Sequence, residues 1–218
     1  MTMDAVVKRR RGRPSKITRE QVLAAAMTLE AADLTMPALA NILGVKTPAL
    51  YHHFTSREAL VGEIGQQLFD ALEIPELDPV NWRPWLLGIN MQLYQFIIDN
   101  PLLIEASDSA EGFLSLTLSL CEAILETLQE AGFEKSESYW IMISLTQIAH
   151  SAARNQIEGS TTELDAEMLA AQFDQINEEW PRTAEFMQLL PQKNNAQWLE
   201  QLLHWSIGCI ADPPAQPA

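Results

Sequence analysis

The chain has 218 residues, of which 47% are hydrophobic, and it carries a formal net charge of −15 with a sequence pI near 4.5. This length allows a small amino-terminal module and one domain with its own hydrophobic core. No apolar run approaches the roughly 20 residues of a membrane span, and no apolar segment follows the basic amino end as in a signal peptide. These features exclude membrane and secreted classes, so we expect a soluble, cytoplasmic protein.

The charges are unevenly distributed along the chain. Residues 1–60 contain nine Lys or Arg and five Asp or Glu. The remaining residues contain five Lys or Arg and 24 Asp or Glu. An acidic protein is repelled by phosphate, so this division restricts any contact with nucleic acid to the first 60 residues. The acidic body also disfavours non-specific binding to DNA.

Residues 1–16 are predicted to form a disordered arm, because positions 8–16 (KRRRGRPSK) are densely charged and lack apolar residues. The RGRP segment at 11–14 resembles the AT-hook, a short motif that lies in narrow A·T-rich minor grooves. Its glycine permits close approach, and the negative potential of the groove attracts Arg11 and Arg13. A solubilising tail that contacts only phosphates is the alternative, and the sequence leaves both open.

The segment 17–73 is predicted to be a DNA-binding domain with four helices. The patterns place these helices at about 18–32, 36–43, 47–53 and 56–72. Thr35 is expected to cap the second helix and Gly44 to end it, while Thr47 caps the third helix and Pro48 takes its first position. A helix, a short turn and a second helix form the arrangement that places a helix in the major groove of DNA.

A linker with two prolines, IPELDPVN at 74–81, marks the predicted start of a second domain that spans 74–212. Its helices are predicted at about 83–99, 102–107, 111–131, 136–156, 165–180 with a continuation near 190, and 195–211. Residues 213–218 are predicted to be a disordered tail. No alternating run rich in Val, Ile and Thr occurs, so the expected fold class is all-α with nine or ten helices.

The sequence offers no pattern for a metal site, a cofactor or a catalytic centre. Cys121 and Cys209 lack the spacing of metal ligands and are expected to be buried thiols on apolar helix faces. His52 and His53 are adjacent in a helix and therefore project in different directions. No P-loop, nucleophile elbow, HExxH motif or glycine-rich dinucleotide turn is present, so we do not expect an enzyme.

The segment GVKTPALYHHFTSREAL at 44–60 resembles the signature of the tetracycline-repressor (TetR) family of transcriptional regulators. That signature is a Gly-Val turn, a short recognition helix, Leu-Tyr-x-His-Phe and a basic residue that opens the fourth helix. The matching residues are Leu50, Tyr51, His53, Phe54 and Arg57, preceded by Thr35, Leu39, Ala40, Gly44 and Val45. The resemblance is strong over 17–70 and beyond that rests on helix order. Met36 and Pro37 stand where the tetracycline repressors have polar or basic residues, and His52 replaces a tryptophan.

The residue types of the third helix suit contacts with DNA. Thr47 can hydrogen-bond to base edges or phosphate, Ala49 can contact a thymine methyl group, and His52 lies close to them on the helix. Tyr51 and His53 suit phosphate contacts. The complete set of predicted DNA-binding residues is Arg11, Arg13, Thr35, Lys46, Thr47, Pro48, Ala49, Tyr51, His52, His53 and Arg57.

One helix pair of this kind binds DNA too weakly for specificity, so we expect a homodimer on a palindromic operator. In the resembled family the last helix and the third-last helix form the interface between subunits. Small and apolar residues on one face of the corresponding helices predict the same here. They are Ser144, Ile148, Ser151, Asn155, Trp198, Leu202, Trp205 and Cys209.

The resemblance also implies a small-molecule effector inside the second domain, with helix 56–72 as the transmitter to the DNA-binding part. An effector that favours the state unable to bind DNA lowers the affinity for DNA. The chain contains six Trp and eight Met, which suit an apolar, adaptable cavity. The candidate effector-binding residues are Met91, Tyr94, Gln95, Trp140, Gln147, His150 and Arg154. Structural packing is the alternative for each, and the metal-binding pattern of the tetracycline repressors is not recognisable.

The sequence therefore predicts a sequence-specific DNA-binding transcriptional regulator, expected to be a repressor that a small, apolar effector releases from its operator. A DNA-binding architectural or partner-controlled protein without an effector is the alternative.

Overall fold

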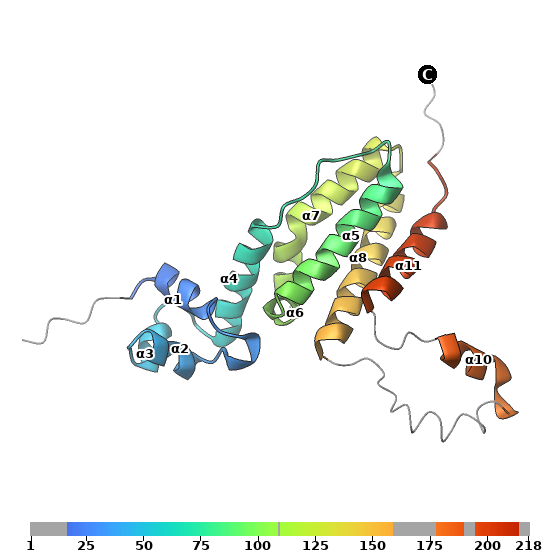
Figure 1. Cartoon of the computed structure of the whole chain (residues 1–218). Helices are drawn as coiled ribbons and strands as arrows, with labels where there is room; N and C mark the ends of the chain where they lie inside the picture. The colour runs from blue at the N-terminus through green and yellow to red at the C-terminus, as the bar shows by residue number, and fades with distance from the viewer. Residues whose placement is uncertain (1–16, 109, 159–177, 190–194, 214–218) are drawn as a thin grey trace, which may run out of the picture. The chain divides into compact units, whose positions relative to one another are not determined.

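The computed structural model describes residues 17–108, 110–158, 178–189 and 195–213. These residues form α-helices and one short 3-10 helix, with no strand among them, so the predicted all-α fold class is confirmed (Figure 1). The elements are α1 (Arg19–Ala26), η1 (Ala31–Asp33), α2 (Met36–Ile42), α3 (Thr47–Leu50), α4 (Arg57–Asp70), α5 (Trp82–Asp99), α6 (Leu102–Ser107), α7 (Ala110–Glu130), α8 (Lys135–Glu158), α10 (Pro181–Leu189) and α11 (Asn195–Gly208).

The chain divides into two compact units, Met1–Leu60 and Val61–Ala218. The division falls inside α4, so this helix contributes its first turn to unit 1 and the rest to unit 2. The domain boundary that we predicted from the sequence, at 73/74, follows the end of this helix and stays a prediction.

Helix α1 begins where the sequence predicts and ends earlier. The Thr18 hydroxyl accepts a hydrogen bond from the Gln21 amide while the Gln21 side chain accepts one from the Thr18 amide, and the two bonds form a capping box. The predicted end near residue 32 is wrong, because the helix stops at Ala26 and Glu30 has an extended backbone. The intervening turn lets the side chain of Leu34 enter the core, where it is buried.

The pair α2 and α3 forms the expected helix-turn-helix. The Thr35 hydroxyl accepts a hydrogen bond from the Ala38 amide and so caps α2. Gly44 follows the end of α2 with a φ of +64°, and the next amide, that of Val45, donates to the Ala40 carbonyl. A residue with a positive φ directly after a helix is the usual site of glycine, because it has no Cβ to clash.

Helix α3 is shorter than the predicted span 47–53. It comprises Thr47–Leu50, and its cap residue is Lys46, so the prediction of Thr47 as the cap is wrong and Pro48 takes the second helical position. A hydrogen-bonded turn continues the chain, in which the amides of His53 and Phe54 both donate to the Leu50 carbonyl. Helix α4 is capped by Ser56, whose hydroxyl accepts a hydrogen bond from the Ala59 amide.

Unit 2 is a helical bundle in which α5 packs against α8 and α11. Helix α8 also contacts α7 and α11, and α6 packs on α7 (Figure 1). The helices present apolar stripes to one another and bury a continuous core. Its fully buried large side chains are Ile64, Leu86, Ile89, Ile97, Leu103, Ile124 and Leu128.

The predicted helix at 165–180 lies almost entirely outside the described residues. Its end at residue 180 agrees with the structure, in which residues 178 and 179 are helical, residue 180 is not, and Pro181 begins the separate helix α10. The first turn of a helix suits proline, because an amide hydrogen is not needed there. No helix in the described part of the chain is long and apolar enough to cross a bilayer.

Candidate nucleic-acid interface and cavity

The amino end of α3 and the turn that follows it present polar side chains on the surface of unit 1. Lys46, Pro48, Tyr51 and His52 are exposed, and 50% of the Tyr51 surface is accessible. Thr47, Ala49 and His53 are half-buried on the same short segment. Seven of the predicted DNA-binding residues therefore lie together, on α3 and directly before and after it.

The opposite face of this segment anchors it in the unit. Leu50 and Phe54 are buried in the core, as the family signature implies for packing residues. The guanidinium group of Arg19 lies over the Phe54 ring, 4.2 Å from its centroid, and it donates a hydrogen bond to the His53 carbonyl. Arg19 positions the end of the turn, and the sequence did not point to it because the contact joins α1 to a residue 34 positions away.

The four other predicted DNA-binding residues have structural contacts or lie outside the described range. Arg57 donates from Nε to the Leu34 carbonyl at 2.6 Å, so part of its hydrogen-bonding capacity is used inside unit 1. Thr35 is exposed and its hydroxyl caps α2. Met36, the departure from the family pattern, is buried and packs in the core. Arg11 and Arg13 lie outside the described residues.

Unit 2 contains a mainly apolar cavity of about 30 Å³ among α4, α5, α6, α7 and α8. It is lined by Phe69, Leu93, Ile97, Leu103, Ser107, Thr117, Leu120, Cys121, Met142, Ile143, Thr146 and His150. A cavity of this size holds no more than a few water molecules, so a larger occupant would have to displace its walls. Phe69 from α4 is one of these walls, and its ring packs edge-on against Phe96 with 5.4 Å between centroids.

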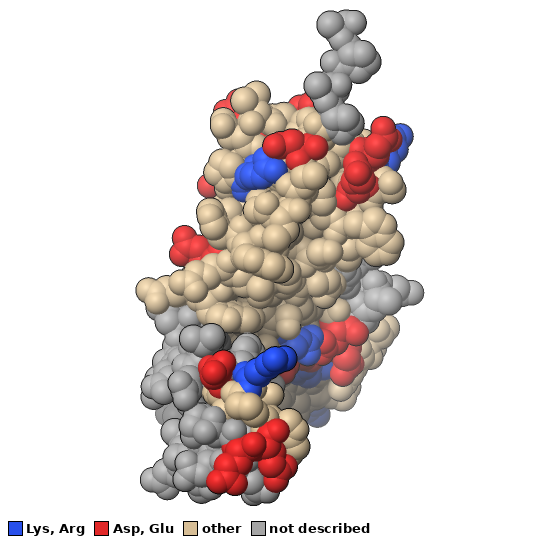
Figure 2. Space-filling model, turned by 90° about the vertical axis from the view of Figure 1, so that its right-hand side faces the viewer, with Lys and Arg blue, Asp and Glu red and all other residues tan. Residues whose placement is uncertain are grey.

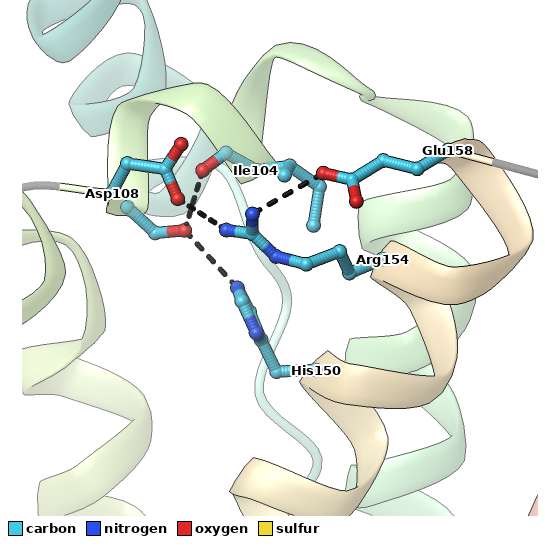
Figure 3. Close-up of polar contacts among 6 residues, drawn as sticks. Ile104, Asp108, His150, Arg154 and Glu158 are labelled. Atoms are coloured by element: carbon cyan, nitrogen blue, oxygen red, sulfur yellow. Dashed lines mark hydrogen bonds and ion pairs between the residues drawn. The ribbon is translucent and has the colours of Figure 1, made fainter. Parts of the chain in front are cut away.

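A polar cluster joins the end of α6 to α8 beside this cavity (Figure 3). The Ser107 hydroxyl donates to the Ile104 carbonyl at 2.8 Å and lies 3.0 Å from Nε2 of His150. One helical turn further along α8, Arg154 forms ion pairs with Asp108 and with Glu158, the latter at 3.2 Å. Burial lowers the pKa of His150, and the positive charge of Arg154 lowers this pKa further, whereas Asp108 acts in the opposite direction.

Of the seven residues predicted to bind an effector, His150 lines the cavity. Arg154 belongs to the polar cluster, Tyr94 is buried and Met91 is half-buried. Gln95 and Gln147 are exposed, as is Trp140, with 66% of its surface accessible.

The sequence missed most of the lining, including Phe69, Leu103 and Thr146. The signal that existed was the periodicity of α8, whose residues Met142, Thr146 and His150 follow at intervals of four. This spacing shows that the residues share a face, but only packing shows which face of a helix meets its neighbours.

The residues predicted to form a dimer interface lie on the outer faces of α8 and α11. Trp198 and Trp205 are 42% and 69% exposed, and the neighbouring stripe of α11, formed by Leu199, Leu203 and Ile207, is buried instead. On α8, Ser144, Ser151 and Asn155 are exposed and Ile148 is half-buried, as is Leu202 on α11. The side of the molecule on which α11 lies in Figure 1 has a broad area without charged residues (Figure 2).

The cysteines differ in their surroundings. Cys121 lines the cavity and burial raises the pKa of its thiol, whereas Cys209 is exposed directly after the end of α11. The expectation of a buried thiol on a helix face is therefore wrong for Cys209, because the residue follows the last residue of α11 and is exposed in the single chain. Among the described residues no group of three or more His, Cys, Asp or Glu could hold a metal ion.

Residues 22–64 match the family model of the bacterial regulatory proteins of the tetR family. Comparison with curated protein sequences finds no match.

Solved structures share the fold of nearly the whole chain. The TetR family protein ActR from Streptomyces coelicolor, in complex with (S)-DNPA, has a TM-score of 0.71 at 18% identity and covers 88% of this chain and 96% of its own. ActR in complex with actinorhodin has a TM-score of 0.68 at 16% identity, and the match covers 89% of this chain and 95% of the ActR chain. A single-residue variant of TetR from Acinetobacter baumannii, in complex with minocycline, has a TM-score of 0.58 at 17% identity. This match covers 92% of this chain and 98% of the TetR chain.

The family match falls on the helix-turn-helix unit whose exposed face was described above, and the structural matches extend the same fold through unit 2. The resemblance that the signature indicated is thereby confirmed: residues 22–64 match the model of the tetR family of bacterial regulatory proteins, and nearly the whole chain shares the fold of solved TetR family structures.

Proposed function

We propose that this DNA-binding regulator is a homodimeric repressor that a small molecule releases from a palindromic operator. The observation that carries the proposal is the shared role of α4. Its first turn belongs to the unit that presents α3, and Phe69 near its other end lines the cavity of unit 2. A ligand that displaces the Phe69 ring would act on the helix that leads to the DNA-binding unit.

The DNA contact is proposed at the amino end of α3. Thr47 and Ala49 would meet base edges in the major groove, with His52 beside them, because hydroxyl, methyl and imidazole groups can distinguish bases there. Tyr51 would reach a phosphate through its exposed hydroxyl. The basic arm with Arg11 and Arg13 would add contacts with the backbone or the minor groove.

The dimer is proposed to form through the outer faces of α8 and α11. Trp198 and Trp205 provide large apolar surfaces of the kind that interfaces bury. The small side chains of Ser144 and Ser151 would let helices approach closely. A two-fold axis would present two copies of α3 to half-sites about one turn of DNA apart, roughly 34 Å.

Release by an effector is proposed as a shift between two states of the dimer. The ligand needs to bind the state that cannot hold DNA more tightly, and the difference in affinity sets the loss of DNA binding. Relatives of the same fold have been solved with actinorhodin, (S)-DNPA and minocycline bound. An architectural protein without an effector would not require a cavity against α4, so the lining by Phe69 favours the regulated form.

The test is fluorescence anisotropy of the full chain with DNA from upstream of its own gene, against a scrambled duplex, at two salt concentrations. We expect binding that depends on sequence, and a loss of at least tenfold in affinity when Thr47 and His52 are both replaced by Ala, since each base contact contributes about 1–3 kcal/mol. Gln67→Ala, at an exposed position of α4 in unit 2, is the matched control and should bind as the wild type does.

Equal and strongly salt-sensitive binding to both duplexes would contradict the proposal for that site. It would reduce the DNA contact to charge neutralisation, because phosphate contacts carry no sequence information.

A further inference from the structure

The cavity of unit 2 has a chemical character that restricts its occupant. None of the residues described as lining it is Lys, Arg, Asp or Glu. Most of its wall is hydrocarbon, and its polar atoms belong to hydroxyl, thiol and imidazole groups. A charged group that enters such a space loses its hydration and finds no opposite charge in the lining, which is strongly unfavourable.

The one titratable imidazole in the lining is held in its neutral form. Burial and the charge of Arg154 both lower the pKa of His150. The Ser107 hydroxyl uses its hydrogen in the bond to the Ile104 carbonyl, so its oxygen accepts from Nε2 of His150. The imidazole is thus fixed as the tautomer with hydrogen on Nε2, and it presents dipoles to the cavity instead of a full charge.

The cation beside the cavity is already compensated. Arg154 is bound to Asp108 of the α6 end and to Glu158 of α8 (Figure 3). These three side chains carry a net charge of −1, so an anion approaching Arg154 would meet two carboxylates and would have to break their ion pairs. The cluster repels anions, while a cation would gain access to carboxylates only by leaving the apolar space.

We infer that the cavity selects an uncharged, mainly apolar effector with one hydrogen-bonding group directed at Ser107 and His150, and rejects anions and cations of the same shape. This inference rests on the proposed function, in which the cavity is the effector site. A hydroxyl of the effector donates to the Ser107 oxygen at the polar end of the cavity, and its apolar body displaces Phe69 and the opposite wall.

The test uses three probes that differ in charge and hardly in shape: 2-naphthalenemethanol, 2-naphthoate and 2-naphthylmethylammonium. Equilibrium dialysis against the full chain at pH 7.5 measures binding without DNA. We expect the alcohol to bind at least about tenfold more tightly than either ion, because of the cost of desolvating a charge. Equal or tighter binding of an ion, or no binding of any probe, overturns the inference.

Two single variants test whether the probes bind in the cavity, and one double variant tests whether the Asp108–Arg154–Glu158 cluster causes the rejection of anions. Ile143→Phe fills the cavity and should abolish binding of the alcohol, while Ile157→Phe, at a half-buried position of the same helix outside the lining, should leave it unchanged. Replacing Asp108 by Asn together with Glu158 by Gln leaves the charge of Arg154 uncompensated. The affinity for naphthoate should then rise at least several-fold relative to that for the alcohol, and an unchanged ratio overturns the role of the cluster.

The same probes separate this inference from the proposed function. If the alcohol binds with the expected selectivity but does not release operator DNA in the anisotropy assay, the proposal of effector release fails and the selectivity of the cavity stands. If operator DNA is bound specifically and no probe enters the cavity, the inference fails and the DNA-binding proposal stands.

Discussion

At the scale of single residues, His150 couples the cavity to pH. Its pKa is lowered in the folded chain, first by burial and then by Arg154, whereas in the unfolded chain the pKa is near the ordinary histidine value of 6.5. As pH falls below 6.5 the unfolded chain therefore takes up the proton first, and the folded state loses stability. The stability that the neutral His150 contributes is present above this pH and is lost below it.

We therefore predict that His150→Gln weakens the dependence of stability on pH between 7.5 and 5.5, measured as the shift in the midpoint of urea unfolding. His204→Gln is the control, because His204 is exposed on α11 of the same unit. This variant should keep the pH dependence of the wild type. A His150→Gln chain that loses as much stability as the wild type over this range would show that the imidazole is not held neutral.

At the scale of elements, the turn between α2 and α3 depends on the backbone of Gly44. Its φ of +64° is a conformation that costs an L-residue about 1–2 kcal/mol, although no atom lies within 4 Å of an added Cβ. The strain thus comes from the backbone alone, and relieving it would move the amino end of α3.

Gly44→Ala should therefore destabilise the fold by about 1 kcal/mol and weaken binding to DNA. Gly88→Ala is the matched control and should stabilise the fold. Gly88 lies inside α5 with open space around it, and alanine is more favourable than glycine in a helix by up to about 1 kcal/mol. Urea unfolding followed by circular dichroism gives both values. If both substitutions change stability in the same direction, the positive φ of Gly44 is not what the turn requires.

At the scale of the whole molecule, the proposed association of two chains depends on the exposed faces of α8 and α11. Trp205 has 69% of its surface accessible in the single chain, which is a large apolar area for an unpartnered helix. A carboxylate in the centre of an interface would be buried without a partner, at a cost of several kcal/mol.

Trp205→Glu should thus convert a dimer into a monomer of 24.4 kDa in sedimentation velocity, and should weaken operator binding along with it. Leu118→Glu is the control, since Leu118 is an exposed apolar residue of α7 outside the proposed face. Dissociation by Leu118→Glu and not by Trp205→Glu would place the interface on another surface.

Local signals in the sequence determined the all-α class, the helix-turn-helix and the family, because caps, glycine ends and the spacing around Tyr51 act over a few residues. They failed where local chemistry is outweighed by packing. Helix α1 stops at Ala26 and Leu34 is buried beyond it, and Cys209 is exposed because α11 ends at Gly208, one residue before it.

Only the tertiary structure decided which residues surround the cavity. Ser107 and His150 lie 43 positions apart, and Phe69 and Met142 reach the same space from α4 and α8. Periodicity groups residues on one face of a helix but does not say which neighbour that face meets. Helix packing makes that choice, and with it determines that the cavity is lined by uncharged groups.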